Sequence, residues 1–208
     1  MNLSFVRSMA IWAAAAGAFT ISSGCASSPD ASETVASMNT LGVEVTRVKD
    51  SIDHTLKALD GVVKTDPNDI RTNFEAYTKS VAALDKQANV VRKRAEEMKA
   101  LGDEFFKEWE TPESMTPERR SQLNASYAKI KSDMTMAKEQ FTPFQKSLKD
   151  IESYLKLDLS PTGINSMGEL VKKAKHDGGQ VKSHIDAVLV QLKGGEPVVV
   201  TMTEAGKP

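Results

Sequence analysis

Three histidines and one cysteine are the side chains best able to bind a metal or to act as a nucleophile. His54, His176 and His184 are far apart in the sequence, and none has an Asp or Glu three residues before it, as the di-iron helix bundles require. The single cysteine, Cys25, excludes an internal disulfide bond and a zinc site built from several thiolates. We therefore predict no metal site and no cofactor.

Motifs and overall charge indicate a protein without catalytic activity. The sequence contains no Gly-x-Ser-x-Gly, no P-loop and no glycine-rich dinucleotide-binding turn. Lysine and arginine total 27 against 28 acidic residues, so the chain carries no strong field that would attract nucleic acid. The sequence predicts neither an enzyme nor a nucleic-acid-binding protein.

Cys25 directly follows a stretch that resembles an export signal. Residues 1–24 contain one early basic residue, Arg7, and then an apolar run over 9–21. This run is shorter than the roughly 20 residues that a membrane-spanning helix requires. A basic start, a short apolar run and small residues before the cleavage site are typical of signal peptides. We therefore predict that residues 1–24 are a signal peptide and that the protein is exported.

The residues next to Cys25 resemble the lipobox of bacterial lipoproteins. Ser22-Ser23-Gly24 supply the small residues, although a lipobox usually has Leu in the place of Ser22. The resemblance implies that Cys25 carries a lipid such as palmitate, with residues 25–37 as a flexible tether. Ala26, in place of Asp, favours the periplasmic face of the outer membrane. The alternative is cleavage by the general signal peptidase, which would leave a soluble periplasmic protein.

The rest of the chain is predicted to form four long helices. Apolar residues recur at alternating three- and four-residue steps, which is a heptad pattern, and Pro- or Gly-containing breaks separate the four stretches. The stretches are 31–64, 70–109, 117–155 and 164–192. Heptad helices joined by short breaks pack side by side around one core. The sequence therefore predicts an all-α fold, an elongated antiparallel bundle that resembles a coiled coil.

This bundle domain is predicted over residues 38–193, and Gly194-Gly195 is predicted to end its last helix. Residues 194–208 are then a disordered C-terminal tail. The heptad residues of each helix form a stripe, which we call the seam. On the first and fourth helices the seam comprises Met38, Leu41, Val45, Val48, Ile52, Thr55, Leu59, Val62, Ile164, Met167, Val171, Ala174, Val181, Ile185, Val188 and Leu192. On the second and third it comprises Ile70, Phe74, Tyr77, Val81, Leu84, Ala88, Val91, Ala95, Met98, Phe105, Trp109, Leu123, Tyr127, Ile130, Met134, Ala137, Phe141, Phe144, Leu148, Ile151 and Leu155.

Residues 105–110, Phe-Phe-Lys-Glu-Trp-Glu, resemble the signature of an uncharacterised, domain-of-unknown-function family of coiled-coil bacterial envelope lipoproteins. The resemblance covers about residues 40–193 and includes Pro143 in the third helix. It also includes Leu155-Lys156 and the later Leu159, Ile164 and Ser166. The resemblance implies a helical envelope lipoprotein and brings no activity.

An aromatic cluster near the end of the second helix is a candidate contact site. The heptad accounts for Phe105 and Trp109 but leaves Phe106 turned by about 100°. Exposed aromatic side chains are strong interface anchors, so we predict an interaction tip here. The alternative is a hydrophobic plug that closes the end of the bundle with Met115 and Leu123.

The sequence as a whole predicts a non-catalytic, membrane-tethered periplasmic bundle that acts as a structural or protein-interaction module. Its partner would be another envelope protein or a second copy. In one alternative, Leu56, Val63 and Leu170 widen the seam of a homo-oligomeric structural or stress-related envelope protein. In another, a loosened core around Pro143 and Gly178-Gly179 carries a small apolar ligand.

Overall fold

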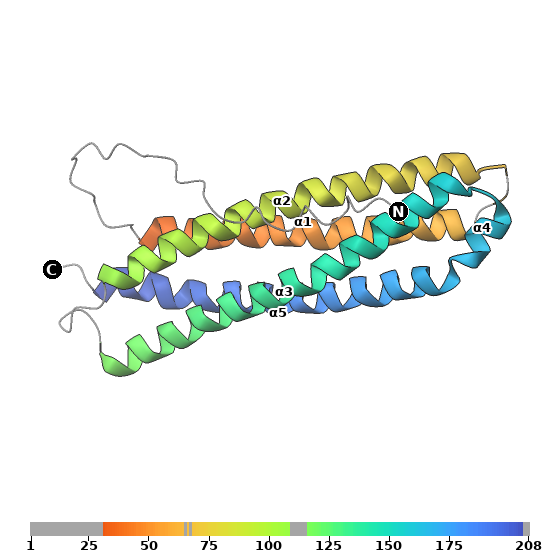
Figure 1. Cartoon of the computed structure of the whole chain (residues 1–208). Coiled ribbons are helices and arrows are strands. Elements are labelled where there is room, and N and C mark those ends of the chain that lie inside the picture. Colours follow the sequence, from red (N-terminus) through yellow and green to blue (C-terminus); the bar gives the residue numbers. More distant parts are fainter. Residues whose placement is uncertain (1–30, 65, 67, 109–115, 206–208) are drawn as a thin grey trace, which may run out of the picture.

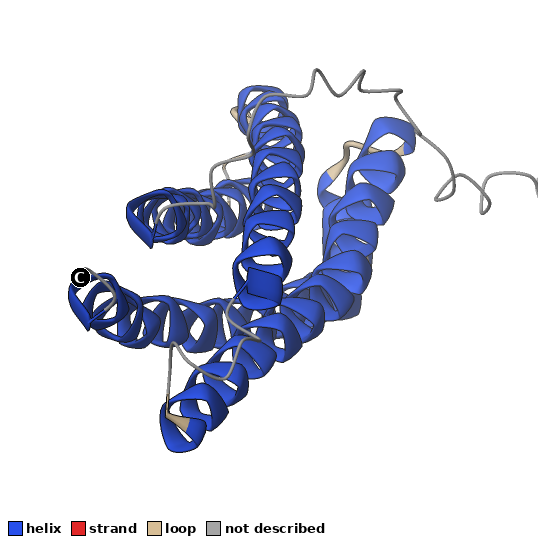
Figure 2. Ribbon diagram, turned by 90° about the vertical axis from the view of Figure 1, so that its left-hand side faces the viewer, coloured by secondary structure: helices blue, strands red, loops and turns tan. Residues whose placement is uncertain are grey.

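The computed structural model describes residues 31–64, 66, 68–108 and 116–205. This part of the chain forms five helices and contains no strand, which confirms the prediction of an all-α fold (Figure 2). The helices are α1 (Ala31–Val63), α2 (Ile70–Glu108), α3 (Pro117–Leu157), α4 (Pro161–Ser166) and α5 (Gly168–Ala205). Within these ranges, none of the helices combines the length and the apolar character that crossing a membrane requires.

The first helix begins where the heptad pattern predicted it, at Ala31. Residues 31–37 of the stretch 25–37, which was predicted to be a flexible tether, are therefore helical. No Pro or Gly occurs between Ala31 and Gly42, so nothing in the sequence interrupts the helix there. A helix that is already anchored by its seam extends backward at little cost.

The fourth predicted helix is divided into α4 and α5. Residues 161–163, predicted to lie in a break, instead form the first turn of α4. The Oγ atom of Ser160 caps this turn by accepting a hydrogen bond from the backbone N–H of Gly163 at 3.1 Å. Pro161 occupies the first helical position, where its missing N–H costs nothing. The chain leaves helical geometry at Met167 before α5 begins.

The predicted end of the last helix is wrong. α5 continues through Gly194-Gly195 to Ala205, so most of the predicted C-terminal tail is helical. Each glycine weakens a helix by only about 1 kcal/mol relative to Ala. Once residues 168–193 are helical, extending the helix no longer requires nucleation.

The long helices lie side by side in a bundle whose contacts are unequal (Figure 1). α1 packs extensively against α2 and α5, and α3 packs extensively against α5, whereas α2 and α3 contact each other at few places. The end of α2 and the start of α3 lie at the same end of the bundle as the start of α1 (Figure 1). Every seam residue of α1, α4 and α5 is buried, so the core runs along these helices.

Candidate functional site

The seams of α2 and α3 leave a cavity in the bundle. Their middle parts are only half-buried, in contrast to the seams of α1 and α5. The half-buried seam residues that line the cavity are Ala88, Val91, Ala95, Met134, Ala137 and Phe141. The cavity has a volume of about 410 Å³, and we call it the side window. Three of the six residues are alanines, whose methyl groups are too small to fill the space between two helices.

The floor of the side window is apolar. α1 contributes Val45 and Val48, and α5 contributes Val181, Ile185 and Val188. All five side chains are buried seam residues. A ligand that entered between α2 and α3 would therefore meet an aliphatic surface that belongs to the core of the bundle.

The mouth of the side window is charged. α2 contributes Arg92, Glu96 and Lys99, whereas α3 contributes Lys131 and Lys138. All of these side chains are exposed or half-buried. The site therefore combines an aliphatic floor with a mouth of four basic and one acidic side chains, an arrangement that suits an amphipathic ligand.

A polar contact joins α2 to α3 about one helical turn beyond one end of the side window's lining. The carboxylate of Asp85 accepts a hydrogen bond of 2.6 Å from Nε2 of Gln145 through one oxygen. Its other oxygen lies 2.8 Å from Nζ of Lys149. Gln145 and Lys149 are one helical turn apart on α3, so they hold the carboxylate from two sides. We call this group the first latch.

A second latch of the same design joins α2 to α3 beyond the other end of the lining. The carboxylate of Asp103 accepts a hydrogen bond of 2.9 Å from the Tyr127 hydroxyl and lies 3.6 Å from Nζ of Lys131. The Lys131 ammonium also lies 5.2 Å from the centre of the Tyr127 ring. The hydrogen bond from Tyr127 and the charge of Lys131 lower the pKa of Asp103 below its ordinary value. Burial, followed by the Asp103 carboxylate, raises the pKa of Tyr127, which therefore remains a donor at neutral pH.

The two latches are separated by the same distance along both helices. Asp103 follows Asp85 by 18 residues, and Tyr127 and Lys131 precede Gln145 and Lys149 by 18 residues. Eighteen residues are five complete turns, so both latches lie on the same face of each helix, about 27 Å apart. The side window is therefore a lateral opening framed at both ends.

Close backbone approach supports the second latch. A Cβ atom added to Gly102 would lie 2.7 Å from Cε2 of the Tyr127 ring, closer than atoms can pack. Gly102 therefore gives Tyr127 the room to reach α2. Gly102 is not an apolar heptad residue, and its role is the close packing of α2 against Tyr127.

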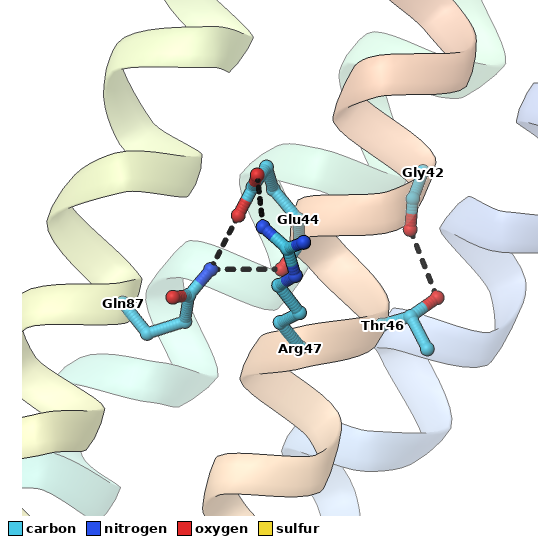
Figure 3. A network of polar contacts seen from close by, with 5 residues as sticks. All are labelled: Gly42, Glu44, Thr46, Arg47 and Gln87. Carbon is cyan, nitrogen blue, oxygen red and sulfur yellow. Dashed lines mark hydrogen bonds and ion pairs between the residues drawn. The ribbon is translucent and has the colours of Figure 1, made fainter.

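A polar network fixes α2 to α1 beside the side window (Figure 3). Nε2 of Gln87 donates a hydrogen bond of 2.7 Å to Oε2 of Glu44, and the Arg47 guanidinium donates one of 2.7 Å to Oε1 of the same carboxylate. Gln87 precedes Ala88, and Glu44 precedes Val45, so these contacts are adjacent to the lining. The α2 wall is thus held by α1 where α3 does not support it.

The residues predicted as sites lie largely outside the described part of the chain. Cys25 and Trp109 are outside the described residues. Phe105 and Phe106 belong to the last turn of α2, where the backbone but not the side chains is described. The lipid anchor and the interaction tip therefore stay predictions.

The histidines do not form a site in the described ranges. His54 and His176 are exposed, and His184 is half-buried. No three His, Cys, Asp or Glu side chains of these ranges gather closely enough to hold a metal ion.

The structure changes the basis of both alternative functions. Leu56, Val63 and Leu170, proposed to widen the seam for a second copy, are half-buried against the core of the same chain. The core around Gly178 is not loosened, because a Cβ atom there would lie 3.0 Å from both Leu56 Cδ1 and Phe144 Cε2. Large side chains fill the space that Gly178 leaves, so the predicted loosening is absent at that residue. The cavity lies nearby between α2 and α3, with Phe141 and Val181 in its lining.

The sequence contains a signal that would have located the side window. Ala88, Ala95 and Ala137 occupy seam positions on two helices that face each other. Small residues on both sides of one interface leave unfilled volume unless the helices move closer together. Reading side-chain size along the seam, in addition to its period, identifies this stretch.

The chain belongs to the family described as "Protein of unknown function (DUF2959)", whose model matches residues 42–193. The predicted resemblance to an uncharacterised family is thereby confirmed. No curated protein and no solved structure matches the chain.

Proposed function

We propose that the protein is a non-catalytic binding module of the bacterial cell envelope, which holds a small apolar ligand in the side window. In this proposal the four long helices act as an elongated antiparallel bundle, related to a coiled coil. The observation that carries it is the 410 Å³ cavity with its aliphatic floor. Small-molecule sites occupy about 300–1,000 Å³ and commonly lie between the helices of bundles.

The shape of the core favours ligand binding over a purely structural role. A bundle that served only as a support would gain stability from a closed core, because each unfilled volume forfeits packing. Here the two latches and the Gln87 contact hold the walls in place around the gap. The polar contacts thus fix the position of α2 relative to α3 and α1 on either side of the gap.

The proposal also includes attachment to a membrane, which is supported by the sequence around Cys25. Lipidation there would keep the bundle at the periplasmic face of the outer membrane. Metabolic labelling with a palmitate analogue, followed by membrane fractionation, compares wild type with Cys25→Ala. We expect label and membrane retention to be lost together in the variant. An unlabelled, soluble wild-type protein would instead indicate a free periplasmic bundle.

Filling the side window tests the ligand-binding role. The double variant Ala95→Leu/Ala137→Leu places two larger side chains in the cavity. We expect saturable binding of the neutral fluorescent probe N-phenylnaphthylamine to wild type, and at least about a tenfold loss of affinity in the filled variant. We also expect unfolding to be unchanged or harder by about 1 kcal/mol, because added methyl groups replace empty space.

A matched control separates this effect from general changes in hydrophobicity. Ala83→Leu/Ala125→Leu adds the same atoms at exposed positions of α2 and α3, away from the lining. This control should bind the probe as wild type does. Equal probe binding by the filled variant and wild type would show that the side window is not the site.

A further inference from the structure

The charges at the side window identify the headgroup that its ligand would carry. Arg92, Lys99, Lys131 and Lys138 line the mouth, and Glu96 is the one acidic side chain among the described lining residues. The chain as a whole has 27 basic and 28 acidic residues, so this excess of positive charge is local. Lys131 is paired with Asp103 in the second latch, so the net positive charge of the mouth comes from Arg92, Lys99 and Lys138 against Glu96. A mouth with a net charge above a low-dielectric floor attracts a ligand of the opposite sign.

The basic side chains are distributed unevenly along the side window. Measured from Asp85 of the first latch, Arg92 and Lys99 lie seven and fourteen residues along α2, whereas Lys138 lies seven residues from Gln145 and eleven from Lys149 along α3. At 1.5 Å per residue, Arg92 and Lys99 are about 10 and 21 Å from that latch, and Lys138 is about 10–17 Å from it. Ala88 and Val91 line the stretch before them. An anionic group would therefore lie toward the second latch, with its apolar part toward the first.

The volume of the cavity suits a small, chain-like ligand. The side window has a volume of about 410 Å³, which lies within the range of about 300–1,000 Å³ that small-molecule sites occupy. A narrow molecule that lies along the gap fits without moving α2 from α3.

We propose that the side window binds a fatty-acid-like amphiphile, a single alkyl chain that ends in a carboxylate. This inference rests on the proposed ligand-binding function and names its ligand class. The alkyl chain lies on Val45, Val48 and Ile185, and the carboxylate is bound by Lys99 and Lys138 at the mouth. Hydrogen bonds between charged partners are the stronger ones, so the headgroup decides which amphiphiles bind well.

The test uses three probes that share one alkyl chain and differ in charge. Dodecanoate, dodecanol and dodecylammonium, each below its micelle concentration, compete with N-phenylnaphthylamine for the full mature chain at neutral pH. We expect dodecanoate to bind about tenfold more tightly than dodecanol, with dodecylammonium the weakest. Added salt should reduce the advantage of dodecanoate, because charges at an exposed mouth are screened.

Charge-removing variants then locate the headgroup. Lys99→Gln/Lys138→Gln should bring the affinity for dodecanoate close to that for dodecanol, so that the ratio of the two affinities falls from about ten toward one. Lys79→Gln/Lys86→Gln removes two exposed charges of α2 that do not line the window, and should keep the preference.

Each result separates the ligand class from the function on which it rests. If dodecanol binds as tightly as dodecanoate, or dodecylammonium binds best, the anionic class is overturned while the side window remains a ligand site. If N-phenylnaphthylamine does not bind at all, the proposed function fails as well. If sedimentation shows a dimer that the probe dissociates, a second copy occupies the window and the amphiphile proposal is overturned.

Discussion

The interface of α1 with α5 and that of α2 with α3 are built from the same heptad pattern, yet one is closed and the other contains a window. Along α1 and α5 every seam residue is buried, whereas the middle seams of α2 and α3 are half-buried. The period of apolar residues is the same in both. What differs is which side-chain sizes face each other.

In the closed interface, a small residue faces large ones. Gly178 of α5 lies against Leu56 of α1 and Phe144 of α3, where an added methyl group would crowd both side chains. In the open interface, Ala88 and Ala95 of α2 line the same cavity as Ala137 of α3. Complementary sizes fill an interface to the density of a crystal, and small residues on both sides cannot.

The polar contacts of the two interfaces also have different roles. Three ion pairs join α1 to α5 in a single antiparallel register. A residue further along α1 pairs with one that lies equally further back along α5. The pairs are Lys49 with Asp186, Asp53 with Lys182, and Asp60 with Lys175. Exposed pairs contribute only about 0.2–1 kcal/mol each, so they set the register while packing supplies the stability. Along α2 and α3, by contrast, the two latches are the main polar contacts at the ends of a gap.

Introducing a carboxylate should distinguish the stability of the two interfaces most strongly. Ile52→Asp places a carboxylate in the closed core, where Ile52 is fully buried, and should destabilise the protein by several kcal/mol. Ala95→Asp places the same group in the side window, beside solvent and basic side chains, and should cost about 1 kcal/mol or less. Unfolding by urea, followed by circular dichroism, measures both.

The two variants are controls for each other because they introduce the same side chain. Equal destabilisation would mean that the side window is closed in solution. A stable Ile52→Asp protein would instead show that the seam of α1 does not face the core.

The period of apolar residues was enough to predict the helices but not the site. Positions such as Leu41, Leu59 and Leu148 recur at heptad spacing, and each is buried as that spacing requires. The helix ends were less predictable, because Gly194-Gly195 lowers helix propensity without forbidding a helix that is already formed.

The side window depends on pairing between residues that are far apart in the sequence. Asp85 meets Gln145, and Asp103 meets Tyr127, only once the register of α2 and α3 is known. The repeat of 18 residues is visible in the sequence only after one latch has been identified. Side-chain period therefore predicts which face is buried, whereas side-chain size and register decide whether that face is filled.

Acid should produce the smallest difference between the two interfaces. The hydrogen bond from Lys175, with that from Lys64, holds the pKa of Asp60 below its ordinary value, and Tyr127 with Lys131 does the same for Asp103. A carboxylate whose pKa is lowered by folding contributes stability above the unfolded pKa of about 3.9, and this contribution disappears as pH falls through the lower folded pKa. Both contributions should therefore be complete at neutral pH and lost only in acid.

Melting temperatures of wild type, Asp60→Asn and Asp103→Asn across this acid range test the prediction. At neutral pH each variant should have a lower melting temperature than wild type. For the partly exposed Asp60 pair, the loss in the free energy of unfolding should be less than about 1 kcal/mol. Below the folded pKa each difference should vanish, because the wild-type carboxyl is then protonated. Probe binding should distinguish the interfaces, since Asp103→Asn weakens an end of the side window and Asp60→Asn does not. A difference in melting that grows in acid would contradict the direction of the pKa shifts.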